Sequence, residues 1–276
     1  MKEISPKIVK FLNSLKDPVE RKRSGLAFAE GENILNELLK NKIKIHSILL
    51  TKIFYEKSKI FLHSIDDEIS IYIVDESLLQ RMSTTKTAYN CVTIFYVKNN
   101  IKTIDEFNVK DVKEKSFLMG FENLQDPGNL GTIIRTSVAF YFKNIFLFAD
   151  SVDPFSPKVI RSSAGAILQL DNIFLIKNDE YESFFSLLKA NNIKIIGTSK
   201  KEGKSSLPDE KFLLRNIPGL IIFGNEGMGI SKSISDFCDS FIVIDQNDQV
   251  ESLNVSIAHS IISYFCKKVI DKLQEK

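Results

Sequence analysis

The second half of the chain contains a series of short apolar segments that alternate with polar, helix-forming stretches. These segments are continuous runs of Ile, Phe, Leu and Val rather than alternating apolar and polar residues. Strands of this kind are covered on both faces, as in a parallel sheet between two layers of helices. The six predicted strands are residues 116–123, 144–150, 172–176, 193–199, 219–224 and 240–245.

Apolar residues at helical spacing lie between these strands and predict the connecting helices. The predicted helices are residues 130–141, 157–166, 180–191, 231–237 and 252–273. Strands and helices in this order predict a doubly wound α/β domain with a parallel sheet and helices on both faces. Such a domain binds its ligands at the carboxyl ends of the strands.

The first 99 residues carry a second, smaller α/β pattern. Its predicted helices are residues 5–16, 31–41, 52–64 and 76–82, and its predicted strands are residues 43–50, 69–75 and 90–98. A basic turn, KDPVERKRSG, follows the first helix. We therefore expect one domain at residues 1–99, a polar linker at 100–115 and a larger domain at 116–276, which suits a chain of 276 residues.

Composition excludes several classes of protein. Hydrophobic residues make up 43% of the chain and charged residues 26%, which is typical of a globular protein and not of a disordered chain. The chain has no apolar leader and no apolar run near the ~20 residues of a membrane span, so we expect a cytoplasmic protein. Cys91, Cys238 and Cys266 have no ligand spacing, so we expect neither disulfides nor a metal site.

The net charge of +2 does not by itself indicate a nucleic-acid partner. Its distribution is more informative, because the first 100 residues carry 16 Lys and Arg against 12 Asp and Glu. A polyanion is therefore better matched to the N-terminal part. Arginine occurs at only six positions, so an arginine within a motif is a stronger signal than a lysine.

Polar and glycine residues gather at the ends of three predicted strands. After the strand at 116–123, the turn Asp126-Pro127-Gly128 leads to Asn129 at a helix start, and Arg135 follows within that helix. Alone, this turn has an alternative reading as an ordinary β-turn and helix cap.

The second group is a loop with three glycines, FGNEGMGIS, after the strand at 219–224. Its spacing is neither GxGxxG nor GxxxxGK[ST], which argues against a nicotinamide oxidoreductase or a P-loop protein. The third group precedes the last helix, where Ser252 and Asn254 either cap the helix or face a ligand.

Together, the three segments resemble motifs 1, 2 and 3 of the SpoU/TrmH family of RNA ribose 2'-O-methyltransferases, within the SPOUT superfamily. The matching stretches are NLQDPGNLGTIIRT, FGNEGMGIS and SLNVSIA, and SPKVIRSSAGAI resembles the segment between the first two. The similarity covers residues 116–270. In the N-terminal part, FAEGENILNELL resembles the small ribosomal-protein-like RNA-binding domain that often precedes the catalytic domain.

The resemblance implies a C-terminal trefoil knot, a homodimer with the last helix as a plausible surface, and S-adenosylmethionine as the methyl donor. It implies methylation of a ribose 2'-hydroxyl, most often in large-subunit (23S) rRNA during rRNA processing, with tRNA as the alternative. The implied cofactor residues are Gly224, Asn225, Gly229, Ile244 and Leu253, and the implied catalytic residues are Asn129, Arg135, Glu226, Ser252 and Asn254.

Among these residues, Arg135 is expected to carry the chemistry. A guanidinium essentially never deprotonates, so Arg135 would either activate the 2'-hydroxyl electrostatically or grip the neighbouring phosphate. Asn129 would orient Arg135 or the ribose, and Glu226 would hold Arg135 or a hydroxyl. Ser252 and Asn254 would shape the pocket. The expected RNA contacts are Arg21, Lys22, Arg23 and Arg161.

One departure from the family pattern precedes the third motif. The family usually has Ile-Pro-Met-x-Gly there, whereas this chain has Ile-Asp-Gln-Asn-Asp at residues 244–248. The added carboxylates leave open a member of the family that binds RNA without catalysis. The retained Asn129, Arg135 and Glu226 argue for the active enzyme.

Overall fold

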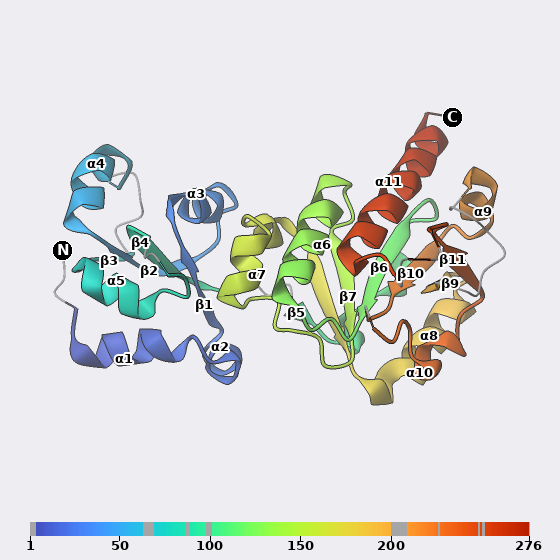
Figure 1. The fold of residues 1–276 in the computed structure, drawn as a ribbon, viewed down its shortest axis with the longest axis horizontal. Coiled ribbons are helices and arrows are strands. Elements are labelled where there is room, and N and C mark those ends of the chain that lie inside the picture. Colours follow the sequence, from blue (N-terminus) through green and yellow to red (C-terminus); the bar gives the residue numbers. More distant parts are fainter. Residues whose placement is uncertain are drawn as a thin grey trace. The chain divides into compact units, whose positions relative to one another are not determined.

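The computed structural model describes residues 4–62, 69–86, 89–97, 101–199, 209–225, 227–247, 249 and 252–275. The chain divides into two compact units (Figure 1). The first comprises residues 1–99 together with 153–169, and the second comprises residues 100–152 and 170–276. A segment from the middle of the chain therefore folds with the N-terminal residues.

The second unit is built on a seven-stranded sheet in which all neighbouring strands are parallel. The strand order is β11-β9-β10-β6-β7-β8-β5. This sheet confirms the predicted fold class and all six predicted strands. The strands are β5 (Ile101–Lys102), β6 (Phe117–Glu122), β7 (Asn144–Phe148), β8 (Asn172–Ile176), β9 (Lys194–Ser199), β10 (Gly219–Phe223) and β11 (Ser240–Val243).

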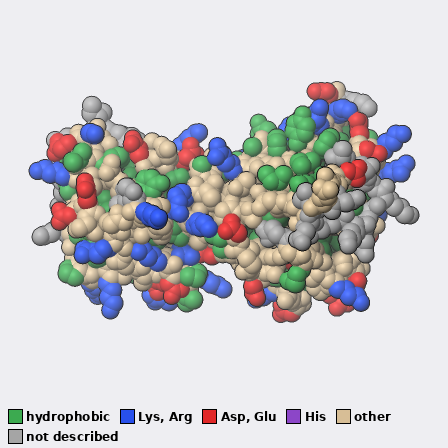
Figure 2. All heavy atoms as spheres, viewed as in Figure 1, with side chains coloured by type: hydrophobic (Ala, Val, Ile, Leu, Met, Phe, Trp, Pro, Cys, Tyr) green, Lys and Arg blue, Asp and Glu red, His purple; other side chains and the backbone are tan. Residues whose placement is uncertain are grey.

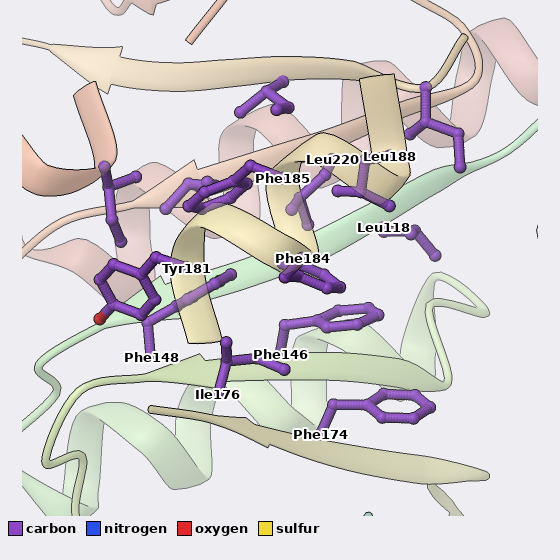
Figure 3. Close-up of a cluster of buried hydrophobic side chains, with 14 residues drawn as sticks. Leu118, Phe146, Phe148, Phe174, Ile176, Tyr181, Phe184, Phe185, Leu188 and Leu220 are labelled. Atoms are coloured by element: carbon purple, nitrogen blue, oxygen red, sulfur yellow. The ribbon is translucent and has the colours of Figure 1, made fainter. Parts of the chain in front are cut away.

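Helices pack on both faces of this sheet. On one face α8 buries Phe184 and Phe185 against Phe146, Phe148 and Leu220, as Figure 3 shows. On the other face α6 and α11 pack against each other. The helices of this unit are α6 (Pro127–Ala139), α8 (Tyr181–Ala190), α9 (Glu210–Arg215), α10 (Lys232–Ser235) and α11 (Val255–Gln274).

Residues 101–112, which we expected to form a linker, are part of the second unit. They contain β5 and two 3-10 turns, η1 (Ile104–Glu106) and η2 (Val109–Asp111). Phe107 packs edge-on against Phe146 and Phe174, with ring centroids 5.4 and 5.3 Å apart. Four widely spaced apolar side chains anchor this segment to the core, and their spacing has no regular period for the sequence to reveal.

The first unit contains a four-stranded sheet of order β1-β4-β2-β3. Its strands are β1 (Leu26–Glu30), β2 (Ile45–Leu50), β3 (Ser70–Ile73) and β4 (Cys91–Tyr96). Its helices are α1 (Pro6–Ser14), α2 (Pro18–Ser24), α3 (Glu32–Lys40), α4 (Lys52–Leu62), α5 (Glu76–Met82) and α7 (Pro157–Ser162), followed by the 3-10 turn η3 (Ala166–Gln169).

Two features of this unit differ from the sequence prediction. The expected basic turn is the helix α2, whose first turn is capped by the Asp17 side chain and which ends at Gly25 with φ +66°. Pro18 at the first helical position favours this start, and glycine favours the left-handed end. The five-residue strand β1 follows directly and was not predicted, since its sequence LAFAE is a short apolar run with two alanines and no β-branched residue.

His259 lies in the core between α11 and the sheet, as its apolar helix neighbours predict. Its ring lies edge-on to Phe121 and Phe223, with centroids 5.2 and 5.3 Å away, and its Nε2 is 3.2 Å from Ser137 Oγ on α6. Complete burial lowers the pKa of His259 to about 3. The imidazole is therefore neutral in the folded protein at physiological pH.

We expect this neutral histidine to make the protein sensitive to acid. Below its ordinary pKa of 6.5 the unfolded chain binds a proton that the folded chain excludes. The unfolding free energy therefore falls by about 1.4 kcal/mol per pH unit until the folded pKa is reached. Denaturant unfolding at pH 7 and pH 5 should show wild type losing about 2 kcal/mol more than His259→Gln, which does not titrate. Equal losses in the two proteins would contradict this assignment.

Candidate functional site

A cavity of about 610 Å³ opens at the carboxyl ends of the strands of the second unit. Its walls come from the ends of β9, β10 and β11, from α10 and from the first turns of α11. All five residues that were expected to hold a cofactor line it: Gly224, Asn225, Gly229, Ile244 and Leu253. Ser252, one of the expected catalytic residues, lines the same cavity.

The glycine loop after β10 folds back on itself along one wall. The Asn225 amide donates to the Gly229 carbonyl (3.0 Å), and the Gly229 amide donates back to the Asn225 carbonyl (2.8 Å). Gly229 has φ +71°, in the left-handed region. A Cβ atom at Gly224 would lie 2.1 Å from the Gly229 carbonyl carbon, so no side chain fits there. This loop requires glycine at position 224 for close packing and at 229 for its backbone conformation.

The same loop is tied to the end of β6. The Asn225 side-chain amide donates to the carbonyl of Asn123 (3.0 Å), and its side-chain oxygen accepts from the Gly227 amide (2.9 Å). Asn123 itself has φ +52°, a region that asparagine tolerates better than most residues. Motif 1 and motif 2 therefore meet at the rim of the cavity.

The chemistry of the cavity walls fits an adenosyl group. Phe241, Ile242, Val255 and Ile262 supply apolar surface, and the glycine loop brings backbone close to the space. Among the described residues that line the cavity, Lys232 is the one charged side chain. The cavity offers little positive charge to bind a triphosphate, whereas its apolar walls and backbone amides suit a neutral base and sugar.

Asn129 and Asn254 are brought together at the starts of two helices. The Asn254 side-chain amide donates to Asn129 Oδ1 (3.0 Å). Asn254 caps α11, accepting from the Ser256 amide (2.9 Å). Asn129 was predicted to cap α6, but the cap is Asp126, whose carboxylate accepts from the Asn129 amide (2.9 Å). Pro127 moves the helix start three residues earlier than predicted, since proline suits a first helical position.

Arg135 lies on an exposed part of α6. Its neighbours Thr136 and Ser137 face α11 instead, with hydroxyl groups 3.3 Å from Ser260 Oγ and 3.2 Å from His259 Nε2. In the described part of the chain Arg135 makes no hydrogen bond or ion pair. Within a single copy of the protein, Arg135 therefore makes no hydrogen bond with Asn129 or Asn254.

Two expected site features fall on residues outside the described ranges. Glu226 lies outside them, and so does Asp248 at the end of the segment that departs from the family pattern. Of that segment, Ile244 and Gln246 line the cavity, and Asn247 Oδ1 accepts from the Gln249 amide (3.0 Å).

The expected RNA contact at Arg21 is corrected by the structure. Arg21 is 5% exposed, and its Nε and Nη2 donate to Asp153 Oδ2 at 2.7 and 2.5 Å. Its Nη1 donates to the Leu15 and Lys16 carbonyls. This guanidinium holds the 153–169 segment within the first unit and is not available to a phosphate.

The other three expected RNA contacts have different surroundings. Lys22 is exposed, and Arg23 is exposed and paired with Glu20 at 2.7 Å. Arg161 donates to Thr84 Oγ1 (2.9 Å) and lies 3.9 Å from the buried carboxylate of Glu30. Lys22 and Arg23 remain predicted RNA contacts, whereas Arg161 has polar partners within its own unit.

Sequence reasoning missed Glu122 at the end of β6. It is buried, and its carboxylate accepts from the amide and the hydroxyl of Ser231. A charged residue that closes an otherwise apolar strand was the available signal. In the described ranges there is no cluster of three potential metal ligands, and no described helix has the length and hydropathy of a membrane span.

Comparison with known families matches both parts of the chain. Residues 116–264 match the SpoU rRNA Methylase family, and residues 6–93 match the MRM3-like substrate binding domain. An uncharacterized tRNA/rRNA methyltransferase of Synechocystis sp. is 31% identical over 95% of this chain and 90% of that protein. The 23S rRNA (guanosine(2553)-2'-O)-methyltransferase RlmP of Bacillus subtilis is 27% identical over 93% of this chain and 94% of that protein.

A solved structure shares the fold over the whole length. The AdoMet-bound rRNA methyltransferase from Sinorhizobium meliloti superimposes with a TM-score of 0.79 at 21% identity, covering 97% of each chain. The family match covers the glycine loop, the Asn129–Asn254 pair and the strands that carry them. The chain therefore belongs to the SpoU rRNA methylase family, and it is an RNA methyltransferase.

Proposed function

We propose that this enzyme transfers a methyl group from S-adenosylmethionine to a ribose 2'-hydroxyl of large-subunit rRNA. The observation that carries the proposal is the cavity built by the glycine loop and Leu253, with the Asn129–Asn254 pair at the starts of α6 and α11. Support for the substrate comes from RlmP, which methylates a guanosine 2'-oxygen of 23S rRNA according to its name. With that substrate the enzyme acts in the cytoplasm.

The residues of the chain position and polarise the reacting groups. When bound, S-adenosylmethionine supplies a methyl group on a sulfonium, and the C–S electron pair stays on sulfur as the ribose oxygen takes the carbon. Asn129 and Asn254 orient the ribose, and Ser252 shapes the cavity wall next to it. Arg135 stabilises the charge that develops on the 2'-oxygen, and the hydroxyl proton passes to water because a guanidinium does not accept it.

Mapping of ribose methylation tests the proposal directly. A strain that lacks the gene should lose one 2'-O-methyl mark in its 23S rRNA, and mass spectrometry of rRNA and tRNA fractions names the molecule and the nucleotide. Purified enzyme with labelled S-adenosylmethionine should restore the mark on rRNA from that strain. Loss of a tRNA mark with intact rRNA would replace rRNA by tRNA as the substrate. Intact marks in both fractions would favour the inactive, RNA-binding alternative.

The active form is proposed to be a homodimer that pairs through α11. Ile257 and Tyr264 lie seven residues apart on this helix, and each is nearly half exposed, at 49% and 48%. Figure 2 shows hydrophobic side chains gathered over α6 and α11. A helix face of this kind is buried when a second copy covers it. We also propose that the C-terminal domain contains the trefoil knot that the sequence resemblance implies.

A charge on this face is expected to produce monomers. In sedimentation velocity, Ile257→Glu with Tyr264→Glu should shift the protein from dimer to monomer at micromolar concentration, because two carboxylates would be buried unpaired. Leu214→Glu on α9 is the matched control, since Leu214 is also exposed, at 40%, but lies on another helix. A wild-type monomer, or a dimer that survives both charges, would contradict the proposed interface.

A further inference from the structure

Glu122 is a buried carboxylate at the end of a central strand, next to the cofactor cavity but outside its lining. It is 5% exposed and lies at the last position of β6. Its Oε2 accepts from the Ser231 amide at 2.8 Å, and its Oε1 accepts from the Ser231 hydroxyl at 2.5 Å. Both carboxylate oxygens are thus committed to a single residue.

Ser231 stands at the far end of the glycine loop, where α10 begins. The near end of the loop is held by the next residue of motif 1, because the Asn123 carbonyl accepts from the Asn225 side chain (3.0 Å). Two consecutive residues, Glu122 and Asn123, therefore hold the loop at Ser231 and Asn225. Between these anchors, Gly229 and Ile230 line the cavity.

Burying a carboxylate at position 122 costs free energy. Among the described residues Glu122 has no ion-pair partner, and a buried charge without a counter-charge is unfavourable unless hydrogen bonds satisfy it. Hydrogen bonds to a charged acceptor are stronger than neutral ones. A neutral side chain would suffice for filling space, so the charge points to a need for a strong, doubly bonded anchor.

We propose that Glu122 is a positioning residue that sets the affinity for the methyl donor by holding Ser231, and with it the glycine loop, in its binding conformation. This inference rests on the proposed function, since it concerns the same cavity. Glu122 does not line the cavity, so it acts through the loop. Without the anchor, binding must first order the loop, and the fraction of binding-competent protein falls.

A double-mutant cycle on the full-length protein tests this role. Calorimetry with S-adenosylmethionine should give a dissociation constant about tenfold higher for Glu122→Ala and for Ser231→Ala, as expected for loss of a charge-assisted bond. The double variant should bind S-adenosylmethionine no more weakly than the weaker-binding single variant, because both substitutions remove the same interaction between Glu122 and Ser231. Glu122→Gln should lose less affinity than Glu122→Ala, since its side-chain amide can still accept from the Ser231 amide and donate to its hydroxyl but lacks the charge that strengthens both bonds.

Further measurements separate positioning from general stability. The KM for the methyl donor should rise in Ser231→Ala while kcat at saturating donor stays within about twofold, a split that global destabilisation does not produce. Ser183→Ala on α8 is the matched control, because its hydroxyl bonds to the Glu180 carbonyl, away from the cavity. If Glu122→Ala does not fold, Ser231→Ala and Glu122→Gln still decide the question.

The outcomes distinguish this inference from the proposed function. If wild type binds the methyl donor and the dissociation constant of Ser231→Ala lies within twofold of the wild-type value, the proposed role of Glu122 is overturned and the proposed function is not. Additive losses in the double variant would overturn it as well. Folded wild type that shows no binding of S-adenosylmethionine would overturn both the proposed function and this inference.

Discussion

Arg135→Ala is expected to lower methyl transfer to RNA by at least about 100-fold, the size of effect seen when one electrostatic stabiliser of a developing oxyanion is removed. Cofactor binding should be unchanged, because Arg135 does not line the cavity. Unfolding temperature should also be unchanged, since the side chain is exposed and has no bonded partner among the described residues. Single-turnover methylation with labelled S-adenosylmethionine, calorimetry and thermal unfolding measure the three quantities.

Two comparison variants sharpen this result. Arg135→Lys keeps the charge but loses the planar guanidinium, so it should retain part of the activity if charge is the main contribution and little if a bidentate grip on phosphate is needed. Arg215→Ala removes another exposed arginine of the same unit, on α9, and should behave as wild type. Near-normal turnover by Arg135→Ala would remove this residue from the proposed mechanism.

Gly224→Ala is expected to abolish binding of S-adenosylmethionine, with a dissociation constant raised by at least about 100-fold. The new Cβ would lie 2.1 Å from the Gly229 carbonyl carbon and 2.3 Å from the Ile230 amide nitrogen, and both are backbone atoms that cannot rotate away. The loop must then separate and lose the paired Asn225–Gly229 hydrogen bonds. Calorimetry with S-adenosylmethionine measures the loss.

Gly227→Ala provides a control within the same loop. A Cβ there would meet only the Asn225 Oδ1 atom, at 3.5 Å, which is an ordinary contact. Gly227→Ala should therefore bind the cofactor within about threefold of wild type. Equal binding by both alanine variants would show that this loop does not form the cofactor wall.

Much of the second unit is predictable because its strands are locally unambiguous. Continuous apolar runs such as residues 219–224 are too short for helices and too apolar for an exposed strand, so each specifies a buried parallel strand. The glycine loop is likewise recognisable by its own glycines. Gly224 and Gly229 of this loop line one cavity together with Leu253. Their roles in binding remain predictions.

The RNA contacts show where local reasoning fails. A basic segment looks the same in the sequence whether its arginines face solvent or a partner, and Arg21 finds Asp153 more than 100 residues away. Burial of that pair depends on a middle segment folding with the N-terminal residues. No local pattern in either segment contains this information.

The helices and strands, the parallel sheet and the family motifs at its strand ends are predictable from local patterns, because backbone propensity and apolar periodicity act over a few neighbouring residues. Which polar groups meet depends on the packing of remote segments. That packing brings Asn129 to Asn254 and Glu122 to Ser231, and it buries Arg21 against Asp153. A buried hydrogen bond or ion pair requires short distances and exclusion of water, and both arise only when remote segments pack together.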